Sequence, residues 1–548
     1  MASVKIEDLT FTYPGASAPA LSNVSLDIRE GEFLLVIGPS GCGKSTLLRH
    51  LKTVLTPHGE RRGRVLVSGR ELSGIPLREQ TADIGFVFQH PDDQIVTDRV
   101  WHELAFALES LGTEQARMRL KVAEMAGYFG LEGVFYNEVS ELSGGQKQLL
   151  NLASVMTLNP KLLVLDEPTS QLDPIAAFDF LTTVKKLNTE LGITVILSEH
   201  RLEEAMPFAD RAAVMENGRI TVCAPPREAA RALFESGSNM FFAMPAAARL
   251  SLELGLEETA LTVNEGRRLL LSMGLPKRRL PEREASASSA SPALSAKGVY
   301  FRYGKDAPDV LKAASIELRP GEIMGLVGGN GSGKSTLLSV LCGERAPYRG
   351  SVRVGGNRMK GRFSAFDARI GMLDQDPRTL FSSETLREEL EKAASHRENA
   401  RARMDDIVSL MDIKELLDRN PFDLSGGEQQ RAAIAIILLT EPEVLLMDEP
   451  TKGMDAGVKR ALGERLRALR DAGIAILLVT HDTEFCAQYA DSVGLMFDGG
   501  VIARAETREF FSRNTFYTTA ASRIAGDVFE NAILISEVTE AVRGTNRE

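Results

Sequence analysis

Two glycine-rich segments, each ending in a lysine and a hydroxyl residue, have the composition of a phosphate-binding loop. They span residues 38–46 and 328–336, and each follows a short apolar run. Glycines allow the backbone to turn its N–H groups toward phosphates without a clash from Cβ. The lysine can then reach the β- and γ-phosphates, and the next hydroxyl can ligate Mg²⁺. A following helix adds the positive end of its dipole.

We therefore predict two nucleoside triphosphate sites, each formed by strand, loop and helix. The residues expected to bind the nucleotide are Gly38, Ser40, Gly41, Gly43, Lys44, Ser45 and Thr46 in the first loop, and Gly328, Asn330, Gly331, Gly333, Lys334, Ser335 and Thr336 in the second.

Each loop is followed later in the chain by an apolar strand that ends in two carboxylates. Asp166 and Glu167 end the first strand, and Asp448 and Glu449 end the second. Phosphoryl transfer to water depends on positioning and on charge stabilisation more than on covalent chemistry. The two aspartates, with Ser45 or Ser335, are candidates to hold Mg²⁺. The two glutamates are candidates to polarise the attacking water.

A glutamine and a histidine recur at matching places in the two halves. Gln89 and Gln375 each end a strand and are candidates to sense the metal and the phosphate. His200 and His481 each follow the strand after the acidic pair. A lone histidine at a strand end is usually structural, but its recurrence in both halves favours a contact with the γ-phosphate or the water. We predict that Glu167, His200, Glu449 and His481 carry the catalysis.

Two further features repeat. Ser143 and Gly145, and again Ser425 and Gly427, lie in a Leu-Ser-Gly-Gly sequence that opens a helix, where the serine is a plausible N-cap. Residues 98–160, which include the first of these sequences, are predicted to be mainly helical. Tyr13 and Tyr303 each follow the first strand of their half and could stack on a nucleotide base. The structural alternative is an aromatic residue at the edge of a sheet.

The order of these features shows that the chain contains two copies of one domain. The offset between copies falls only from 290 residues at Lys44 and Lys334 to 281 at His200 and His481. We expect the first domain at 1–232, a helical appendix at 233–275, a flexible linker at 276–294, the second domain at 295–510 and a second appendix at 511–548. The segment 286–291 is of low complexity. Coincidental similarity between alanine-rich helices is the alternative for the appendices.

Composition limits the classes of function. The chain has 548 residues, of which 43% are hydrophobic and 25% charged, with a net charge of −11. The acidic balance argues against a nucleic-acid partner. Four widely spaced cysteines suit a reducing cytoplasm. No apolar run is long enough to span a bilayer. We expect a soluble protein whose role at a membrane would come through partners.

The order of loop, Gln, Leu-Ser-Gly-Gly, Asp-Glu and His resembles that of the ATP-binding cassette (ABC) ATPases in both copies. This resemblance implies an α/β fold with two tandem P-loop cassettes. Each cassette would combine a parallel sheet core, an antiparallel β subdomain and a helical subdomain, and would bind ATP and Mg²⁺. It also implies a head-to-tail sandwich in which each ATP lies between the loop of one cassette and the Leu-Ser-Gly-Gly signature of the other. Asp173 and Asp455 would then lie between the two sites.

Both copies retain the Lys, Asp, Glu, His and signature Ser, so we predict two hydrolytic sites. One departure from the family pattern follows the signature. The first copy has Leu149 where the second has Arg431 and where the family usually has a basic residue. This difference could weaken communication from the first signature without removing its ATP contacts.

The segments 92–106, 198–204 and 510–517 resemble those of the fused tandem ATPases of energy-coupling factor (ECF) transporters. That family implies a peripheral protein at the cytoplasmic face of the membrane. It would drive import of a vitamin or a transition-metal ion through an integral-membrane coupling (T) protein and a substrate-binding (S) protein. By this resemblance, docking grooves lie near 89–96 and 375–381. The alternative is that Ile95, Val100 and Trp101 are core residues. Other possible functions are a soluble tandem factor acting on ribosomes and the ATPase of another ABC transporter class.

Overall fold

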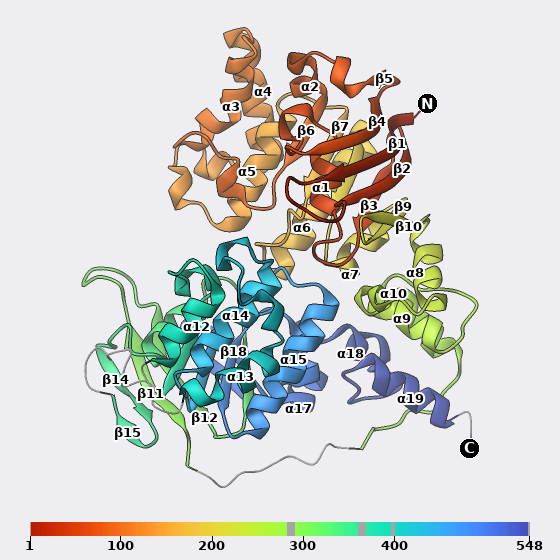
Figure 1. Cartoon of the computed structure of the whole chain (residues 1–548). Helices are drawn as coiled ribbons and strands as arrows, with labels where there is room; N and C mark the ends of the chain where they lie inside the picture. The colour runs from red at the N-terminus through yellow and green to blue at the C-terminus, as the bar shows by residue number, and fades with distance from the viewer. Residues whose placement is uncertain (1, 282–290, 360–368, 396–399, 546–548) are drawn as a thin grey trace. The chain divides into compact units, whose positions relative to one another are not determined.

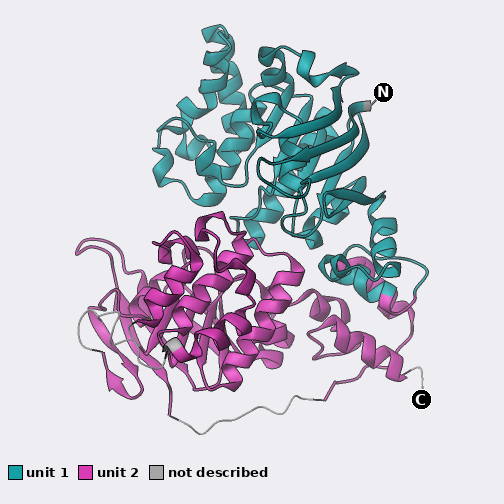
Figure 2. Ribbon diagram, viewed as in Figure 1, with its two compact units in different colours: residues 1–252, 256–262 teal, residues 253–255, 263–548 magenta. Residues whose placement is uncertain are grey.

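The computed structural model describes residues 2–281, 291–359, 369–395 and 400–545. The chain divides into two compact units, one of residues 1–252 and 256–262 and the other of residues 253–255 and 263–548 (Figure 2). Each unit contains one copy of the predicted repeat.

The first unit begins with a four-stranded antiparallel sheet in the order β2-β1-β4-β5 (Figure 1). Alternate residues along β2 are buried, because one face of this sheet packs on the core and the other faces solvent. The strands are β1 (Ala2–Thr12), β2 (Leu21–Arg29), β4 (Glu60–Val67) and β5 (Arg70–Glu71).

A six-stranded sheet in the order β10-β9-β3-β8-β7-β6 forms the centre of the first unit. Its neighbouring strands are parallel except for β10, which pairs antiparallel with β9. Every residue of β3, β7 and β8 is buried, which explains why these strands are apolar at nearly every position. The strands are β3 (Phe33–Ile37), β6 (Ile84–Val87), β7 (Leu162–Asp166), β8 (Thr194–Ser198), β9 (Arg211–Glu216) and β10 (Arg219–Ala224).

The helices of the first unit include the insertion predicted at 98–160, which forms α3, α4 and α5. The helices are α1 (Lys44–Arg49), α2 (Leu77–Asp83), α3 (Val100–Ser110), α4 (Gln115–Tyr128), α5 (Gly144–Met156), α6 (Pro174–Leu191), α7 (Leu202–Ala205), α8 (Pro226–Glu235) and α9 (Ala246–Glu253).

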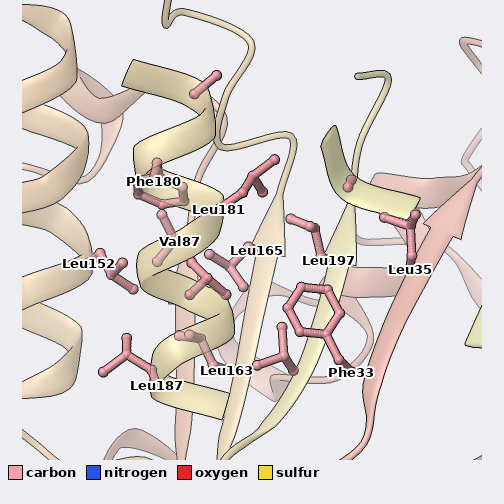
Figure 3. Packing of buried hydrophobic residues seen from close by; sticks show 14 of the residues in the cluster. Phe33, Leu35, Val87, Leu152, Leu163, Leu165, Phe180, Leu181, Leu187 and Leu197 are labelled. Carbon is pink, nitrogen blue, oxygen red and sulfur yellow. The ribbon is translucent and has the colours of Figure 1, made fainter. Parts of the chain in front are cut away.

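The central sheet packs into a different cluster on each face. Phe33 and Leu35 of β3 belong to the cluster that contains Phe180 and Leu181 of α6 (Figure 3). Leu34, the residue between them, belongs to the cluster formed with α1 and the antiparallel sheet. Burial on both faces fixes the carboxyl ends of β3, β7 and β8 at one edge of the sheet, where the predicted site residues follow.

The second unit repeats this topology, with an antiparallel sheet in the order β12-β11-β14-β15 and a central sheet in the order β16-β17-β18-β13-β19-β20. Its strands are β11 (Leu294–Phe301), β12 (Leu311–Leu318), β13 (Ile323–Val327), β14 (Arg349–Val354), β15 (Asn357–Arg358), β16 (Ile370–Leu373), β17 (Val444–Asp448), β18 (Ala475–Val479), β19 (Ser492–Phe497) and β20 (Gly500–Glu506). Its helices are α10 (Val263–Ser272), α11 (Lys334–Leu341), α12 (Leu386–Ala394), α13 (Ala400–Met411), α14 (Gly426–Leu438), α15 (Ala456–Asp471), α16 (Thr483–Tyr489), α17 (Thr507–Arg513), α18 (Ala520–Ala525) and α19 (Ile535–Thr545). The predicted fold class, two tandem cassettes, is confirmed.

The segment predicted as the first appendix, 233–275, is divided between the units. Its helix α10 belongs to the second unit, where it packs on α18. The Arg278 N–H donates to the Val528 carbonyl at 2.8 Å, and Leu280 and Asn531 exchange two hydrogen bonds of 2.7 and 2.8 Å. Residues 278–280 are thus held where the sequence predicts a flexible linker. These bonds use mainly backbone groups of 278–280, so composition could not reveal them. Most of the low-complexity segment, 286–290, lies outside the described residues.

In the parts of the chain that the structure describes, no helix is long and apolar enough to cross a membrane.

Candidate functional site

The two glycine-rich loops connect β3 to α1 and β13 to α11, as predicted. In each loop the lysine is buried and bonds the backbone of its own loop. Lys44 Nζ donates to the carbonyls of Gly38 and Pro39 at 3.0 and 3.2 Å. Lys334 Nζ donates to the carbonyls of Gly328 and Gly329 at 2.9 and 3.0 Å. Both ammonium groups therefore lie at the centre of a loop of backbone groups.

The glycine before each lysine has no room for a side chain. Gly43 has φ +106°, and a Cβ added there would lie 2.6 Å from the Ala20 carbonyl oxygen. Gly333 has φ +101°, and a Cβ added there would lie 3.0 Å from the Val310 carbonyl oxygen. Only glycine combines this backbone conformation with so close an approach.

Asp166 lies at the end of β7 beside the first loop. Its Oδ1 accepts hydrogen bonds from Ser45 Oγ at 3.0 Å and from Ser198 Oγ at 2.8 Å. Burial raises the pKa of Asp166, and the two hydroxyl groups only partly oppose that effect. Asp448 has the same place in the second unit, and burial likewise raises its pKa. A buried carboxylate next to a hydroxyl oxygen suits a hard cation, whose charge would compensate the cost of burial.

Glu167 is the most highly connected residue of the first site. His200 Nε2 lies 2.8 Å from its Oε1, and Gln89 Nε2 donates to its Oε2 at 3.0 Å. Lys44 Nζ lies 3.7 Å away. Burial acts to raise the pKa of Glu167, but the hydrogen bond and charge of His200, with the charge of Lys44, outweigh it and leave the pKa lowered. The first site therefore brings the predicted histidine, glutamine and lysine together around one carboxylate.

Glu449 has the matching place in the second unit but fewer contacts. His481 Nε2 lies 3.5 Å from Glu449 Oε1 and only 3.0 Å from Asn330 Oδ1. Among the described residues, Glu449 Oε1 accepts no hydrogen bond. Burial raises the pKa of Glu449 to about 7, although the charge of Lys334 opposes the shift. Gln375 is exposed and, within the described chain, makes no hydrogen bond to Glu449.

Both glutamates have a backbone conformation that side chains rarely adopt. The φ angle is +45° at Glu167 and +49° at Glu449. Such a conformation costs of order 1–3 kcal/mol and persists where the surrounding structure enforces it. The Glu167 N–H donates to the backbone and side chain of Ser198 on the neighbouring strand, which fixes the turn.

The signature sequences form helix N-termini, as predicted. Ser143 caps α5 through a reciprocal capping box with Gln146. At the start of α14 the N–H and hydroxyl of Ser425 donate to Glu428 Oε2 at 2.8 and 2.7 Å. The second signature glycine lies against the helix that follows Asp173 or Asp455. A Cβ at Gly427 would lie 2.9 Å from Val458 Cγ1, and one at Gly145 would lie 3.5 Å from Ala176 Cβ.

Asp173 and Asp455, which the family resemblance places between the sites, are themselves N-caps. Asp173 accepts the Ala176 N–H at 2.8 Å, and Asp455 accepts the Val458 N–H at 2.9 Å.

Each predicted base-stacking tyrosine is tied to its own loop. Tyr13 Oη lies 3.0 Å from Thr46 Oγ1, and Tyr303 Oη lies 3.0 Å from Thr336 Oγ1. The exposed fractions of the two residues are 38% and 59%. Both rings therefore keep a surface that a base could cover. The guanidinium of Arg345 lies 4.7 Å from the centre of the Tyr303 ring.

Two buried carboxylates hold the segments that follow Gln89 and Gln375. Their role was not predicted from the sequence. Glu103 accepts the N–H groups of Val96 and Thr97 at 3.0 and 2.8 Å. Glu389 accepts those of Ser382 and Ser383 in the second unit. A charged residue next to an apolar helical stripe, repeated in both copies, was the available signal.

Comparisons with known proteins agree with this geometry. The family model described as "ABC transporter" matches residues 21–170 and 311–452. A "Putative ABC transporter ATP-binding protein" of Bacillus thuringiensis subsp. konkukian is 39% identical over 548 residues, which cover 99% of this chain and 98% of the relative. A protein of the same description from Streptomyces avermitilis is 35% identical over 579 residues, with 98% and 100% covered.

Solved structures with similarity to this chain include cbiO1 of Clostridium perfringens, described as part of the ABC transporter complex cbiONQ. It is 28% identical, with a TM-score of 0.39, and the match covers 42% of this chain and 94% of that one. The family model and the 39% identical relative show that the chain belongs to the ABC transporter family. It is an ATP-binding and ATP-hydrolysing subunit of an ABC transporter, with two cassettes in one polypeptide.

Proposed function

We propose that this chain is the ATPase of an ECF-type importer that takes up a vitamin or a transition-metal ion. It would act at the cytoplasmic face of the membrane, with an integral-membrane coupling (T) protein and a substrate-binding (S) protein as partners. The proposal rests on the sequence resemblance at 92–106, 198–204 and 510–517 and on one surface feature of the first unit.

That feature is the surface that follows Gln89. Val96 is 66% exposed and Trp101 is 38% exposed, whereas Val100 between them is fully buried. The alternative that Ile95, Val100 and Trp101 are core residues thus holds for Val100 and in part for Ile95, which is half-buried against the core cluster, but not for Trp101. The backbone of Val96 is held by Glu103, so the apolar side chain is presented on a fixed loop. Val96 lies on the loop that follows Gln89, and Gln89 bonds Glu167. The exposed side chain of Val96 could therefore report the nucleotide state to a partner helix.

The matching surface of the second unit has different chemistry. Phe381 is buried there and meets Phe422 edge-on, with ring centres 6.0 Å apart, and Phe422 is 53% exposed. Asp376 and Arg378 form an ion pair next to it. Two unlike surfaces support the proposal that the two cassettes bind different helices of the coupling protein.

We also propose roles for the site residues. Glu167 and Glu449 would orient the attacking water and accept its proton, and His200 and His481 would contact that water or the γ-phosphate. The ammonium groups of Lys44 and Lys334 would leave the loop carbonyls that they bond in this structure and would bind the β- and γ-phosphate oxygens instead. Mg²⁺, held by Ser45 and Asp166 with Gln89, or by Ser335 and Asp448 with Gln375, would neutralise charge on the phosphates. Each site would be completed by the signature of the other cassette, with Ser425 and Gly427 at the first and Ser143 and Gly145 at the second.

The proposal is tested by purifying the tagged chain from its native cells in mild detergent and identifying its partners by mass. Small integral-membrane proteins are the expected partners. The variant with Val96→Ser and Trp101→Ser should lose them while keeping its ATPase activity, and Leu120→Ser, which changes another exposed apolar side chain (69% exposed), should keep both. Ribosomal proteins without membrane proteins would overturn the proposal in favour of a soluble factor.

A further inference from the structure

A hydrogen bond in the second unit joins the segment after His481 to the C-terminal appendix. Glu484, in the first turn of α16, accepts the N–H of Ala520 through Oε1 at 2.7 Å. Ala520 is the first residue of α18, and its N–H is one that a helix cannot satisfy internally. The bond thus connects a residue three positions after the histidine with the start of an appendix helix.

The first unit contains the same bond. Glu203, three positions after His200, accepts the N–H of Ala246 through Oε2 at 2.8 Å, and Ala246 is the first residue of α9. The glutamate and the alanine are 43 residues apart in the first unit and 36 in the second. Because the connection differs in length, the bond does not follow from local chain geometry, and both copies have retained it.

The start of α18 does not depend on Glu484 alone for capping. In α18 the side chain of Thr519 already accepts the N–H of Ser522 at 3.1 Å. Glu484 therefore supplies a second acceptor from outside the appendix. A carboxylate at a helix N-terminus is also favoured by the helix dipole. This bond can transmit a displacement of the histidine segment to the appendix.

The second appendix has another contact with its nucleotide site. The Tyr517 hydroxyl lies next to the second glycine-rich loop, where a Cβ added to Gly329 would be 3.9 Å from it. Ala243 has the matching place in the first copy. In the second unit the appendix thus meets both the phosphate loop and the segment after the histidine.

We propose that Glu203 and Glu484 are positioning residues through which each appendix sets the place of the adjacent histidine at the ATP site. The inference rests on the proposed roles of His200 and His481. When the histidine moves between nucleotide states, the bond makes the appendix helix move with it. Conversely, a partner that holds the appendix would hold the histidine.

Proline at Ala246 and Ala520 tests the link by removing the donor while keeping both glutamates. Proline is tolerated at the first position of a helix, where no internal hydrogen bond is lost. The variant with Ala246→Pro and Ala520→Pro should lower kcat of the full chain by roughly 3- to 10-fold and leave the KM for ATP within about 2-fold, because a displaced catalytic group slows the reaction more than it weakens binding. Glu203→Gln with Glu484→Gln keeps an acceptor oxygen and should retain most of kcat. Thr519→Ala, which weakens α18 without touching the bond, should leave kcat unchanged.

Hydrogen exchange distinguishes the proposed coupling of histidine and appendix from a purely structural role of the glutamates. Adding ATP with vanadate should slow exchange at 518–530 in the wild-type chain but not in the proline variant. If the proline variant is unstable, Glu203→Ala with Glu484→Ala provides the same comparison. Wild-type kcat and a wild-type exchange response in these variants would overturn the inference. His200→Ala with His481→Ala separates the two claims, since full activity in that variant would reject the proposed histidine roles instead.

Discussion

The two nucleotide sites share one backbone frame but differ around the glutamate. In the first site Glu167 is bonded to His200 and Gln89, and its pKa is lowered. In the second site His481 Nε2 lies 3.0 Å from Asn330 Oδ1 and 3.5 Å from Glu449 Oε1, and the pKa of Glu449 is raised to about 7. The same motif residues therefore do not have the same environment.

The loop residue that precedes Gly41 in the first motif and Gly331 in the second accounts for part of the difference. The second loop has Asn330 where the first has Ser40. The longer amide side chain reaches the histidine, and the histidine is then 3.5 Å rather than 2.8 Å from the glutamate. One residue in the phosphate loop can thus change the ionisation of a carboxylate on another strand.

We expect the largest effect when both glutamates are replaced. The variant with Glu167→Gln and Glu449→Gln should bind ATP normally but lose roughly 10²- to 10³-fold in turnover, the usual cost of losing one preorganised group at a reacting centre. ATPase assays and equilibrium ATP binding measure the two properties. Turnover near that of the wild type would reject the assigned roles, whichever site is stronger.

The next comparison uses the two lysines singly. Lys44→Ala and Lys334→Ala should each leave partial ATPase activity, because the other site is retained. We expect Lys44→Ala to lose more than half of the activity and Lys334→Ala less than half, since Glu167 is already in contact with His200 and Gln89 whereas His481 Nε2 lies against Asn330. Equal losses would show that the sites contribute equally. Complete loss in either variant would show strong coupling between the sites.

Much of the fold of the two cassettes could be predicted from the sequence, because repeated motifs identify repeated structure. The apolar run before Asp166 predicted a strand that ends in two carboxylates, and β7 is buried at every position and ends at Asp166. Ser143 was predicted as a helix cap and is one. These features depend on local pattern, which a sequence displays directly.

The differences between the sites could not be predicted in this way. The orientation of His481 toward Asn330 depends on side-chain distances across separate strands. The exchange of hydrogen bonds between Leu280 and Asn531 joins segments 251 residues apart through groups that carry no compositional signal. The roles of Glu103 and Glu389 became visible only when their backbone partners were located.

The lowered and raised pKa values predict opposite effects of Gln substitutions on stability. The folded-state pKa of Glu449 is raised from 4.5 to about 7, so its ionisation destabilises the fold increasingly as the pH rises from 4.5 to 7, and fully above 7. In nucleotide- and Mg²⁺-free protein, Glu449→Gln should therefore raise stability at pH 8, by on the order of 2 kcal/mol.

Glu167 has a lowered pKa, so its stabilising contribution is present above about 4.5 and is lost as the pH falls through the folded-state value. Glu167→Gln should lower stability at pH 8. Thermal unfolding of the two single variants at pH 6 and pH 8 tests both signs. Shifts of the same sign at pH 8 would contradict the difference between the sites.

The smallest expected effect concerns the helix after each signature. Arg431 of α14 donates to the Asp412 carbonyl at 2.9 Å and to its carboxylate at 3.1 Å, and Asp412 has φ +53°. The first copy has Leu149 and Gly130 at these places, and Gly130 has φ +66°. The second copy thus combines a strained aspartate with an arginine that holds it, whereas the first uses a glycine that needs no such support.

Arg431→Leu should cost about 1 kcal/mol or less, because the Asp412 side chain is 77% exposed and solvent screens the ion pair. Leu149→Arg alone should bring no gain, since Gly130 offers no carboxylate, and it serves as the matched control. Urea unfolding measures both changes, and the KM for ATP should stay unchanged in both. A large loss of ATPase activity in Arg431→Leu at unchanged stability would instead show that the basic residue transmits motion from the signature, which Leu149 in the first copy cannot do by charge.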